Sequence, residues 1–394
     1  MAKVEAPWKP SVYLGAATRS VIGKFGGALK SLKASELAAQ CLKETVKRSG
    51  RSQFDGLILG HARQAGSGPN PARQSVFLAG LETQLPAITV NQACASGMTA
   101  VQMAAEKVIA GRGSHYLAGG VESMSNTPYL VPEARWGKKM GHVEFIDGMY
   151  RDGFFCPMSQ MVMGETVERF IAQERGITRS DQDDYAFLSL TRAIETWKKS
   201  GFSKEVVSFE AQGKFTGLTT DEHLRMDSLR DSLNKLSPVF DPKSGTITAG
   251  NSSGITDGSA SMLVSSERQS SSMVRLLDMS CVAIDPRYMG LAPVPAIQEI
   301  LLRHRLGWDQ IEAVEINEAF AAQVLACQRD LKIPMEKLNS RGGAIAIGHP
   351  IGASGARILV SLMHTLQGKP GALGIASACV SGGMGIACLV ESLD

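Results

Sequence analysis

Short apolar runs alternate along much of the chain with segments that repeat apolar residues at helical spacing, which predicts a layered α/β fold. In the first third we expect strands at 11–17, 56–60, 87–90 and 115–122, and helices at 35–48, 70–81 and 96–110. The alternation returns after residue 260, with strands at 261–264, 274–284, 313–316, 372–378 and 384–390, and helices at 295–306, 318–331 and 354–366. The pattern therefore predicts two regions of α/β structure.

The stretch between these regions has a different character. It carries scattered prolines, many charges and few apolar runs, with one clear helix that we expect to run from Ser180, as its N-terminal cap, to about Lys199. We interpret it as an insertion. The predicted organisation is an N-terminal half over 1–124, completed by about 252–272, an inserted loop domain over 125–251 and a C-terminal half over 273–394.

A faint internal repeat relates the two halves. Around Cys94 the sequence suggests a strand, the cysteine, a glycine three residues later and a helix, and the same order recurs around His349. A repeat this short also arises by chance in unrelated sequences. If it is genuine, each half places one reactive side chain at the N-terminus of a helix.

Composition excludes several classes of protein. The 394 residues are 44% hydrophobic and 20% charged, and the 41 glycines follow no triplet period, which excludes collagen and low-complexity chains. A net charge of +3 gives no support for binding nucleic acid or a membrane surface. The seven cysteines form no CxxC pair, so we expect reduced thiols and no metal. Since neither a secretory signal nor a membrane-spanning run is visible, we expect a cytoplasmic protein.

Cys94 and His349 are the first candidates for chemistry. Cys94 stands between a predicted strand and a helix, and the partial positive charge of a helix N-terminus lowers the pKa of a thiol there. His349 lies in the glycine-dense turn 342–355, between a predicted apolar strand and a helix, where an imidazole can act as general base. The plain alternatives are a buried unreactive cysteine and a turn histidine held by a backbone hydrogen bond.

Two further strand ends carry candidates. Cys379 leaves a predicted strand into a Ser-Gly-Gly turn, whose backbone N–H groups are suited to stabilise an oxyanion. The alternative there is a hairpin with an incidental cysteine. Asn317 and Glu318 follow the strand 313–316 and are suited to hold a water molecule or to orient the histidine. The alternative for this pair is a cap on the next helix.

Taken together, these strand-end motifs resemble those of the thiolases, a family that comprises acetyl-CoA C-acetyltransferases and 3-ketoacyl-CoA thiolases. The resemblance covers essentially the whole chain, through QAGSGPNPARQ, VNQACASGM, AGGVESMSNTPYL, GTITAGNSSGITDGSA, YMGLAPVPA, NEAFAAQ, GGAIAIGHPIGASGARI and CVSGGMG. It implies a duplicated α/β/α/β/α layered fold, in which two similar mixed-sheet halves are joined by an inserted loop domain.

The resemblance implies a Claisen-type acyl transfer between two coenzyme A (CoA) thioesters. Cys94 would be the nucleophile that the first acyl-CoA acylates, and His349 would take its proton. Cys379 would then remove the α-proton of a second acetyl-CoA, or return it in the thiolytic direction. His349 and a water held by Asn317 would form an oxyanion hole for the enolate.

Supporting groups follow from the same resemblance. The backbone N–H groups of Cys94 and Ser381, with Gly382 beside them, would form a second oxyanion hole, and Glu318 would anchor the cluster. The family usually has a glycine where this sequence has Ser381. The backbone amide survives that change, but the added hydroxymethyl group puts the acyl preference in doubt.

The insertion would cover the site and bind CoA. By position, Arg225 would meet the adenine or phosphate end of CoA, and Ser253, with Ala249, the pantetheine. The acyl pocket would be lined by Met163, Met289 and Phe320. For the two methionines, ordinary core packing is the alternative. We interpret the remaining histidines and cysteines as structural or surface residues.

The implied function is an acetyl-CoA acetyltransferase that reversibly condenses two acetyl-CoA to acetoacetyl-CoA plus CoA, favoured by the NPARQ segment and the loop 121–153. The alternatives are a degradative 3-ketoacyl-CoA thiolase of fatty-acid β-oxidation, a ketoacyl synthase and a non-catalytic acyl-CoA carrier. A cysteine at 379 argues against the synthase, and the four reactive positions together argue against the carrier. We expect no cofactor, and a homo-oligomer, either a dimer or a tetramer, that uses residues near 125–150.

Overall fold

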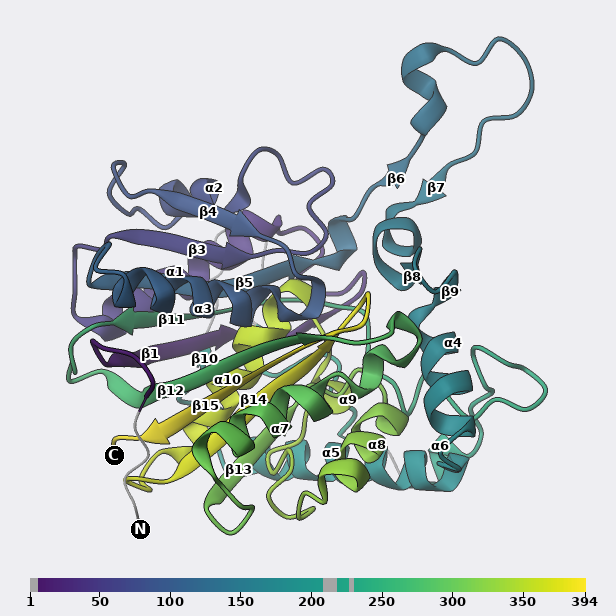
Figure 1. The fold of residues 1–394 in the computed structure, drawn as a ribbon. Coiled ribbons are helices and arrows are strands. Elements are labelled where there is room, and N and C mark those ends of the chain that lie inside the picture. The colour runs from purple at the N-terminus through teal and green to yellow at the C-terminus, as the bar shows by residue number, and fades with distance from the viewer. Residues whose placement is uncertain (1–5, 208–217, 227–229) are drawn as a thin grey trace.

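One large sheet crosses the molecule in the computed structural model, which describes residues 6–207, 218–226 and 230–394 (Figure 1). Its main path follows β13 (Ile311–Ile316), β14 (Leu373–Val380), β15 (Met384–Ser392), β12 (Ser272–Ala283), β1 (Val12–Ser20), β11 (Thr256–Ser265), β5 (His115–Ser123), β3 (Gly56–Gly60) and β4 (Ala87–Val90). Beside this path, β2 (Gly23–Lys24) pairs with β11 and β10 (Val206–Val207) pairs with β1.

The two halves of the sheet repeat one pattern of strand pairing. At the outer edges the pairs are parallel, β4 with β3 and β3 with β5 on one side and β13 with β14 on the other. Toward the centre the pairing is antiparallel, through β5, β11 and β1 and through β14, β15 and β12. The central pair of β1 and β12 is also antiparallel, with Val12 opposite Leu276, so two similar mixed halves meet in one sheet.

Helices lie outside and between these halves, each pair in its own apolar core. Helices α1 (Ala34–Ser49) and α2 (Pro71–Leu78) pack on β3 and β5. Helices α3 (Ser96–Ile109) and α10 (Ile351–Leu366) share a central core with strands of both halves. Helices α7 (Pro293–His304) and α8 (Ala321–Leu331) pack on β13 and β14. Helices α1 and α2, one half of the sheet, helices α3 and α10, the other half of the sheet, and helices α7 and α8 therefore form five successive layers. This is the predicted α/β/α/β/α order. Within the described ranges, no helix is both long and apolar enough to cross a membrane.

Helices α3 and α10 cross in backbone contact close to their N-terminal ends. A Cβ atom at Gly97 would lie 2.7 Å from the backbone nitrogen of Ala356, and one at Gly355 would lie 2.7 Å from that of Met98. Such distances are shorter than side-chain atoms tolerate, so both positions require glycine. The crossing holds together the two helix N-termini that follow the predicted reactive residues.

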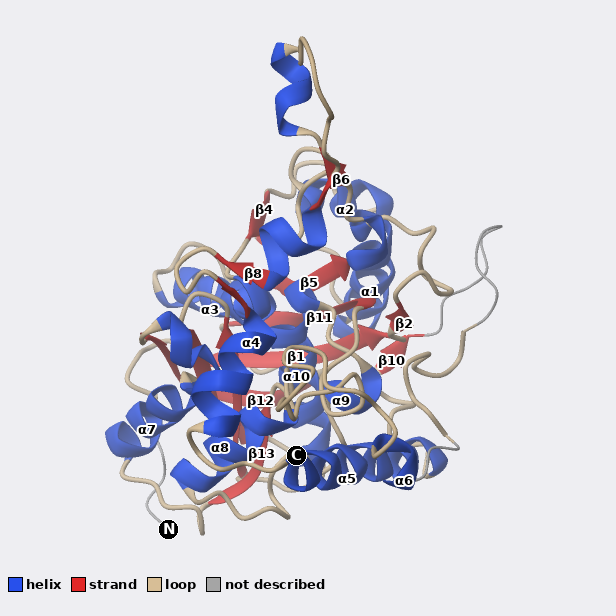
Figure 2. Cartoon of the chain, turned by 90° about the vertical axis from the view of Figure 1, so that its right-hand side faces the viewer, coloured by secondary structure: helices blue, strands red, loops and turns tan. Residues whose placement is uncertain are grey.

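The insertion sends out a long arm between β6 (Tyr129–Leu130) and β7 (Ile146–Asp147) (Figure 1). The other short elements are β8 (Phe155–Cys156), β9 (Met161–Val162), α4 (Met163–Val167), α6 (Arg230–Leu233) and, in the C-terminal half, α9 (Ala344–Ile347). The long helix of the insertion is α5 (Arg179–Lys198). Figure 2 shows α5 and α6 at the end of the molecule opposite the arm.

Helix α5 begins before the predicted cap. Its N-cap is Thr178, whose hydroxyl accepts the N–H of Asp181 at 3.1 Å while the Asp181 carboxylate accepts the N–H of Thr178 at 3.0 Å. This reciprocal capping box satisfies two N–H groups that a helix start leaves without partners. The predicted cap at Ser180 is therefore wrong, because Ser180 already lies in the first turn of the helix.

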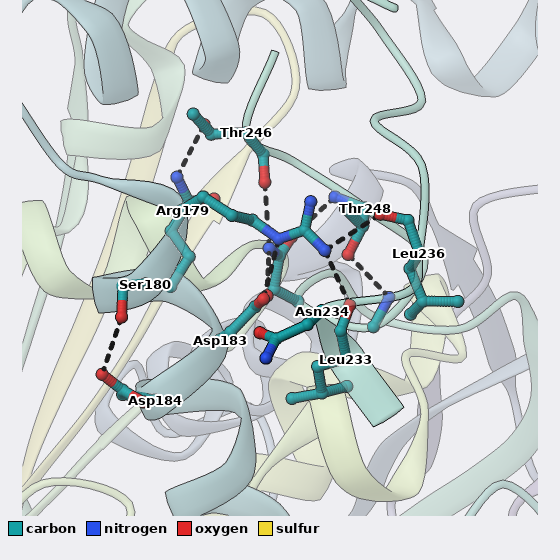
Figure 3. Close-up of polar contacts among 12 residues, drawn as sticks. Arg179, Ser180, Asp183, Asp184, Leu233, Asn234, Leu236, Thr246 and Thr248 are labelled. Carbon is teal, nitrogen blue, oxygen red and sulfur yellow. Dashed lines mark hydrogen bonds and ion pairs between the residues drawn. The ribbon is translucent and has the colours of Figure 1, made fainter. Parts of the chain in front are cut away.

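The start of α5 also holds residues of the segment 233–251, which leads from α6 back to the sheet (Figure 3). The guanidinium of Arg179 donates to the carbonyl oxygens of Leu233 at 2.7 Å and Leu236 at 2.9 Å. The carboxylate of Asp183 accepts from Arg179 at 2.7 Å and from the Asn251 amide at 2.8 Å. These contacts hold the residues around 249–253 against α5.

Candidate active site

Cys94 lies in a short 3₁₀ helix, Ala93–Ala95, that joins β4 to α3. Ala93 has a φ of 46°, in the left-handed region that residues with a side chain rarely adopt, and its N–H donates to the Asn91 side-chain oxygen at 2.9 Å. Strained backbone of this kind clusters at functional sites. The turn places Cys94 on the wall of a cavity of about 380 Å³.

Burial raises the pKa of the Cys94 thiol to about 11. The Arg63 guanidinium and the backbone N–H groups of Ser381 and Cys94 itself act in the opposite direction, because each favours a thiolate. The predicted lowering of this pKa by the helix N-terminus is wrong, since desolvation of the buried sulfur outweighs the donors around it. Those two N–H groups, which converge on the sulfur, are the pair that the resemblance assigned to an oxyanion hole.

The segment before His349 is a short helix, α9, and the predicted strand there is wrong. The N–H of Ile347 donates to the carbonyl of Gly343 at 3.0 Å, and that of Gly348 donates to Ala344 at 2.9 Å. An apolar run this short has no periodicity that separates a strand from a buried helix. Gly348 then turns the chain with a φ of 108°, and His349 follows with little exposure.

A hydrogen-bonded chain fixes the tautomer of His349. Its Nδ1 lies 2.5 Å from the Ser354 hydroxyl, which donates its own proton to the carbonyl of Pro350 at 2.9 Å. Ser354 therefore accepts from Nδ1–H, which leaves the lone pair of the ring on Nε2. Burial, together with the charges of Arg357 and Arg63, lowers the pKa of His349 to about 3. The ring is neutral at neutral pH, and the lone pair of Nε2 can accept a proton.

Asn317 contacts His349, as the predicted cluster requires. Its N–H donates to the carbonyl of Ser377 in β14 at 2.9 Å, which fixes the backbone just after β13. The side-chain Nδ2 lies 3.5 Å from Nε2 of His349, and Oδ1 lies 3.5 Å from Nη2 of Arg357. Since arginine can only donate, Arg357 determines that Oδ1 faces it and that Nδ2 faces the imidazole.

Glu318 lies behind the cavity and fastens the insertion to the sheet. Its carboxylate accepts from the Tyr185 hydroxyl at 2.8 Å, the Ser189 hydroxyl at 2.7 Å and the N–H of Ile345 at 3.1 Å. Tyr185 and Ser189 belong to α5, and Ile345 belongs to α9. The alternative of a helix cap is wrong here, because Phe320 occupies the cap position of α8 and the carboxylate turns toward α5 and α9.

Cys379 is the penultimate residue of β14. Burial, with the neighbouring Cys94 as the next cause, raises the pKa of its thiol well above the ordinary range. In the turn that follows, Gly382 and Gly383 have φ values of 86° and 81°, whereas Ser381 lies outside the left-handed region. The backbone therefore accommodates a serine at 381 without strain and favours glycine at the next two positions.

The cavity collects most of the predicted residues. Cys94, His349, Cys379 and Ser381 line it. The side chains expected to bind CoA and the acyl group line it as well, namely Arg225, Ala249, Ser253, Met163, Met289 and Phe320. Asn317, Glu318 and Gly382 are not part of this lining.

The residues of the cavity wall that sequence reasoning missed include two with basic side chains, Arg63 and His223. Burial, with the charge of Arg225, lowers the pKa of His223 to about 4, so the ring is neutral. The interpretation of this histidine as a structural or surface residue misses its place on the cavity wall. A signal for Arg63 was available, because it follows β3 shortly after the strand ends, as Asn317 follows β13.

Two family models match nearly the whole chain, the thiolase N-terminal domain over residues 12–268 and the thiolase C-terminal domain over residues 270–392. The chain belongs to the thiolase family. A Staphylococcus aureus protein described as a probable acetyl-CoA acyltransferase is 42% identical over 390 residues, which cover 96% of this thiolase and 98% of that protein.

Solved structures of the family share the fold of this thiolase. The Bacillus anthracis acetyl-CoA acetyltransferase superposes with a TM-score of 0.92 at 37% identity, over 100% of both chains. The human mitochondrial 3-ketoacyl-CoA thiolase superposes with a TM-score of 0.92 at 32% identity, over 97% of this thiolase and 99% of that chain. This thiolase is therefore an acyltransferase. It is similar both to an acetyl-CoA acetyltransferase and to a 3-ketoacyl-CoA thiolase, whose names give different substrates.

Proposed function

We propose that this thiolase condenses two molecules of acetyl-CoA to acetoacetyl-CoA plus CoA and also catalyses the reverse thiolysis. The observation that carries the proposal is the meeting of Cys94, His349 and Cys379 on one cavity, with the N–H of Ser381 directed at the Cys94 sulfur. Two thiols and a neutral imidazole in one cavity are the groups that acyl transfer through a covalent thioester requires.

In the first half-reaction, Cys94 attacks the carbonyl carbon of one acetyl-CoA. His349 accepts the thiol proton on Nε2, because Ser354 keeps the other ring proton on Nδ1. Since the pKa of the thiol is about 11, the free enzyme holds the thiol form, and proton transfer accompanies the attack. The N–H groups of Cys94 and Ser381 then stabilise the oxyanion of the tetrahedral intermediate. CoA leaves with the proton of the Cys379 thiol, which becomes a thiolate.

In the second half-reaction, Cys379 removes the α-proton of another acetyl-CoA. The raised pKa of this thiol suits the task, because a stronger base is better matched to a carbon acid. The Nδ2 group of Asn317, which Arg357 turns toward His349, supplies a donor for the enolate oxygen, directly or through a water. The carbanion attacks acetyl-Cys94 to form acetoacetyl-CoA, and the released Cys94 sulfur recovers its proton from His349.

A second candidate is degradative thiolysis of longer 3-ketoacyl-CoAs, which the likeness to the human mitochondrial 3-ketoacyl-CoA thiolase favours. Comparing kcat/KM for thiolysis of acetoacetyl-CoA with that of longer and 2-methyl-branched 3-ketoacyl-CoAs separates the two. The highest value for acetoacetyl-CoA supports the proposal, and a strong preference for 3-ketooctanoyl-CoA or longer chains contradicts it. Turnover of malonyl-carrier protein alone would indicate a ketoacyl synthase, and CoA binding without turnover would indicate a carrier.

The proposed reaction uses CoA thioesters as substrates and requires no cofactor, because the covalent step and both proton transfers fall to side chains. We also propose a cytoplasmic homo-oligomer, a dimer or tetramer, in which the arm contacts another copy. The arm exposes the apolar side chains of Trp136, Met140 and Phe145, which are 85%, 89% and 73% accessible. A smaller mass in solution for Trp136→Glu than for the wild type supports this role, and an unchanged mass contradicts it.

A further inference from the structure

Arg63 is a buried cation on the wall of the catalytic cavity. Its residue is 6% exposed, and it lines the cavity with Cys94 and His349. Its Nε atom is buried and has no hydrogen-bond acceptor, and none of the ion pairs found among the described residues involves its guanidinium. Buried arginines are normally paired, because an uncompensated charge is costly to desolvate. The arrangement points to an anion that enters the cavity.

The neighbouring carboxylates are turned to other partners. Glu122, at the end of β5, accepts the backbone N–H groups of Arg63 at 3.1 Å and Gly352 at 2.8 Å, and its Oε1 lies 3.1 Å from Nε2 of His61. Asp152 shares a second cavity with Arg63 but is exposed. In the part of the chain that the structure describes, neither carboxylate forms an ion pair with the guanidinium.

The backbone at Gly153 makes room for this side chain. A Cβ atom at Gly153 would lie 2.4 Å from Nη2, 2.5 Å from Nε and 2.6 Å from Cζ of Arg63. The guanidinium therefore lies flat against the glycine, where a larger residue would displace it. Tyr150 and Phe154, from the same short helical segment, line the cavity beside it. Arg63 is thus held in place on the same wall as the nucleophile.

We propose that Arg63 binds a carboxylate at the end of the acyl chain, so that this thiolase also cleaves 3-ketoacyl-CoAs whose chain ends in a carboxylate. The inference rests on the proposed thiolase chemistry and names a further class of substrate for the same site. The two cations of the cavity then have separate anions: the exposed Arg225 takes the CoA end, and the buried Arg63 takes the acyl end next to Cys94.

The reaction balances without an added reagent. The Cys94 sulfur, after giving its proton to His349, bonds to C3 of the substrate; the C2–C3 bond breaks, and C2 takes the proton of the Cys379 thiol to give acetyl-CoA. A carboxyacyl group remains on Cys94, with its carboxylate at Arg63. CoA then gives its thiol proton to Cys379 and attacks the thioester. The products are a carboxyacyl-CoA and the Cys94 sulfur, which recovers its proton from His349.

The test compares two substrates of equal chain length, 3-oxoadipyl-CoA, which ends in a carboxylate, and 3-oxohexanoyl-CoA, which ends in a methyl group. The measured quantity is the ratio of their kcat/KM values in thiolysis. Using this ratio removes the effect of Arg63 on the reactivity of Cys94, which is common to both substrates. The variants are Arg63→Met, Arg63→Lys and the control Arg151→Met, which deletes an exposed charge on the neighbouring segment.

We expect a ratio above one in the wild type and in Arg151→Met, a fall of roughly tenfold or more in Arg63→Met, and partial retention in Arg63→Lys. A wild-type ratio at or below one, with 3-oxohexanoyl-CoA or acetoacetyl-CoA still cleaved, overturns the inference and leaves the proposed function standing. An unchanged ratio in Arg63→Met also overturns it, because Arg63 would then act only on Cys94. Failure to cleave any of the three thioesters overturns both.

Discussion

The Nδ1 atom of His349 lies 2.5 Å from the hydroxyl oxygen of Ser354, and that hydroxyl gives its proton to the Pro350 carbonyl. One side chain in the first turn of α10 thus determines which ring nitrogen of the histidine carries the proton. Because Nε2 is left as the acceptor, Ser354 positions the imidazole for its proposed role as general base.

Ser354→Ala removes this constraint on the tautomer. We expect kcat for thiolysis of acetoacetyl-CoA to fall by roughly tenfold or more, with a smaller change in KM, because the loss is in proton transfer. Ser361→Ala, which deletes another buried hydroxyl of the same helix, is the control. Equal effects of the two substitutions would show that Ser354 has only a packing role.

The reactivity of Cys94 toward iodoacetamide should keep rising with pH. Because the pKa of the thiol is about 11, the thiolate fraction increases about tenfold per pH unit between about pH 7 and pH 9, where an ordinary thiol begins to level off. His349, with a pKa of about 3, adds no inflection in this range. The rate is followed by mass spectrometry of the Cys94 peptide, with exposed Cys281 as the internal reference. A plateau of Cys94 alkylation below pH 8 would contradict the burial argument.

The effect of a substitution in the turn after Cys379 should depend on the backbone conformation of the residue that is replaced. Ser381→Gly keeps the N–H group and the backbone, so we expect kcat within a few-fold of the wild type. Gly383→Ala places a Cβ atom 2.3 Å from the carbonyl of Ile284 at a φ of 81°, and we expect a loss of at least about 1–2 kcal/mol in the free energy of unfolding. Urea denaturation and acetoacetyl-CoA thiolysis measure both effects. A collapse of activity in Ser381→Gly would show that the serine hydroxyl takes part in the reaction.

Glu205 should matter for stability more than any surface ion pair of the insertion. Its buried carboxylate lies 2.6 Å from Arg19 and 2.7 Å from Arg341, and it joins the insertion to β1. Glu205→Gln leaves buried Arg19 with one fewer counter-charge, and we expect a loss of about 3–5 kcal/mol in the free energy of unfolding. Glu195→Gln, in an exposed pair with Lys199, should change it by less than about 1 kcal/mol.

The effect of Glu205 should also depend on pH. Burial by itself raises the pKa of this carboxyl, but the charges of Arg341 and Arg19 outweigh burial and lower the pKa to about 2. Its contribution is therefore present above the pKa of the unfolded chain, about 4.3, and is lost as the pH falls toward 2. The difference between the wild type and Glu205→Gln, measured by urea denaturation, should shrink over that window. A difference that stays constant with pH would contradict the ion-pair account.

Much of the site could be predicted because its chemistry lies at the ends of sheet strands and the starts of helices. Cys94, Asn317 and Cys379 were found in this way, and the crossing of α3 and α10 explains why Cys94 and His349 meet. Burial could not be predicted, so the direction of the pKa shift of Cys94 was wrong. The short apolar run before His349 carries no period, so the sequence does not distinguish its helix from a strand.

Arg63 is a second case in which burial could not be predicted from the sequence. Its place after β3 fits the rule that found Asn317, but only the packed structure shows that its buried Nε has no acceptor among the described residues. A sequence shows which residues are charged but not which of them will be buried. The cavity that Arg63 lines is formed by segments far apart in the chain.

The proposed reaction passes through an acyl group on Cys94. The most direct test is to mix the enzyme with acetyl-CoA, quench with acid and locate the acetyl group by peptide mass spectrometry. We predict one acetyl group on the Cys94 peptide in the wild type and in Cys379→Ala, and none in Cys94→Ala, which should still bind CoA. Acetylation of another residue instead of Cys94, or turnover by Cys94→Ala, would contradict the account.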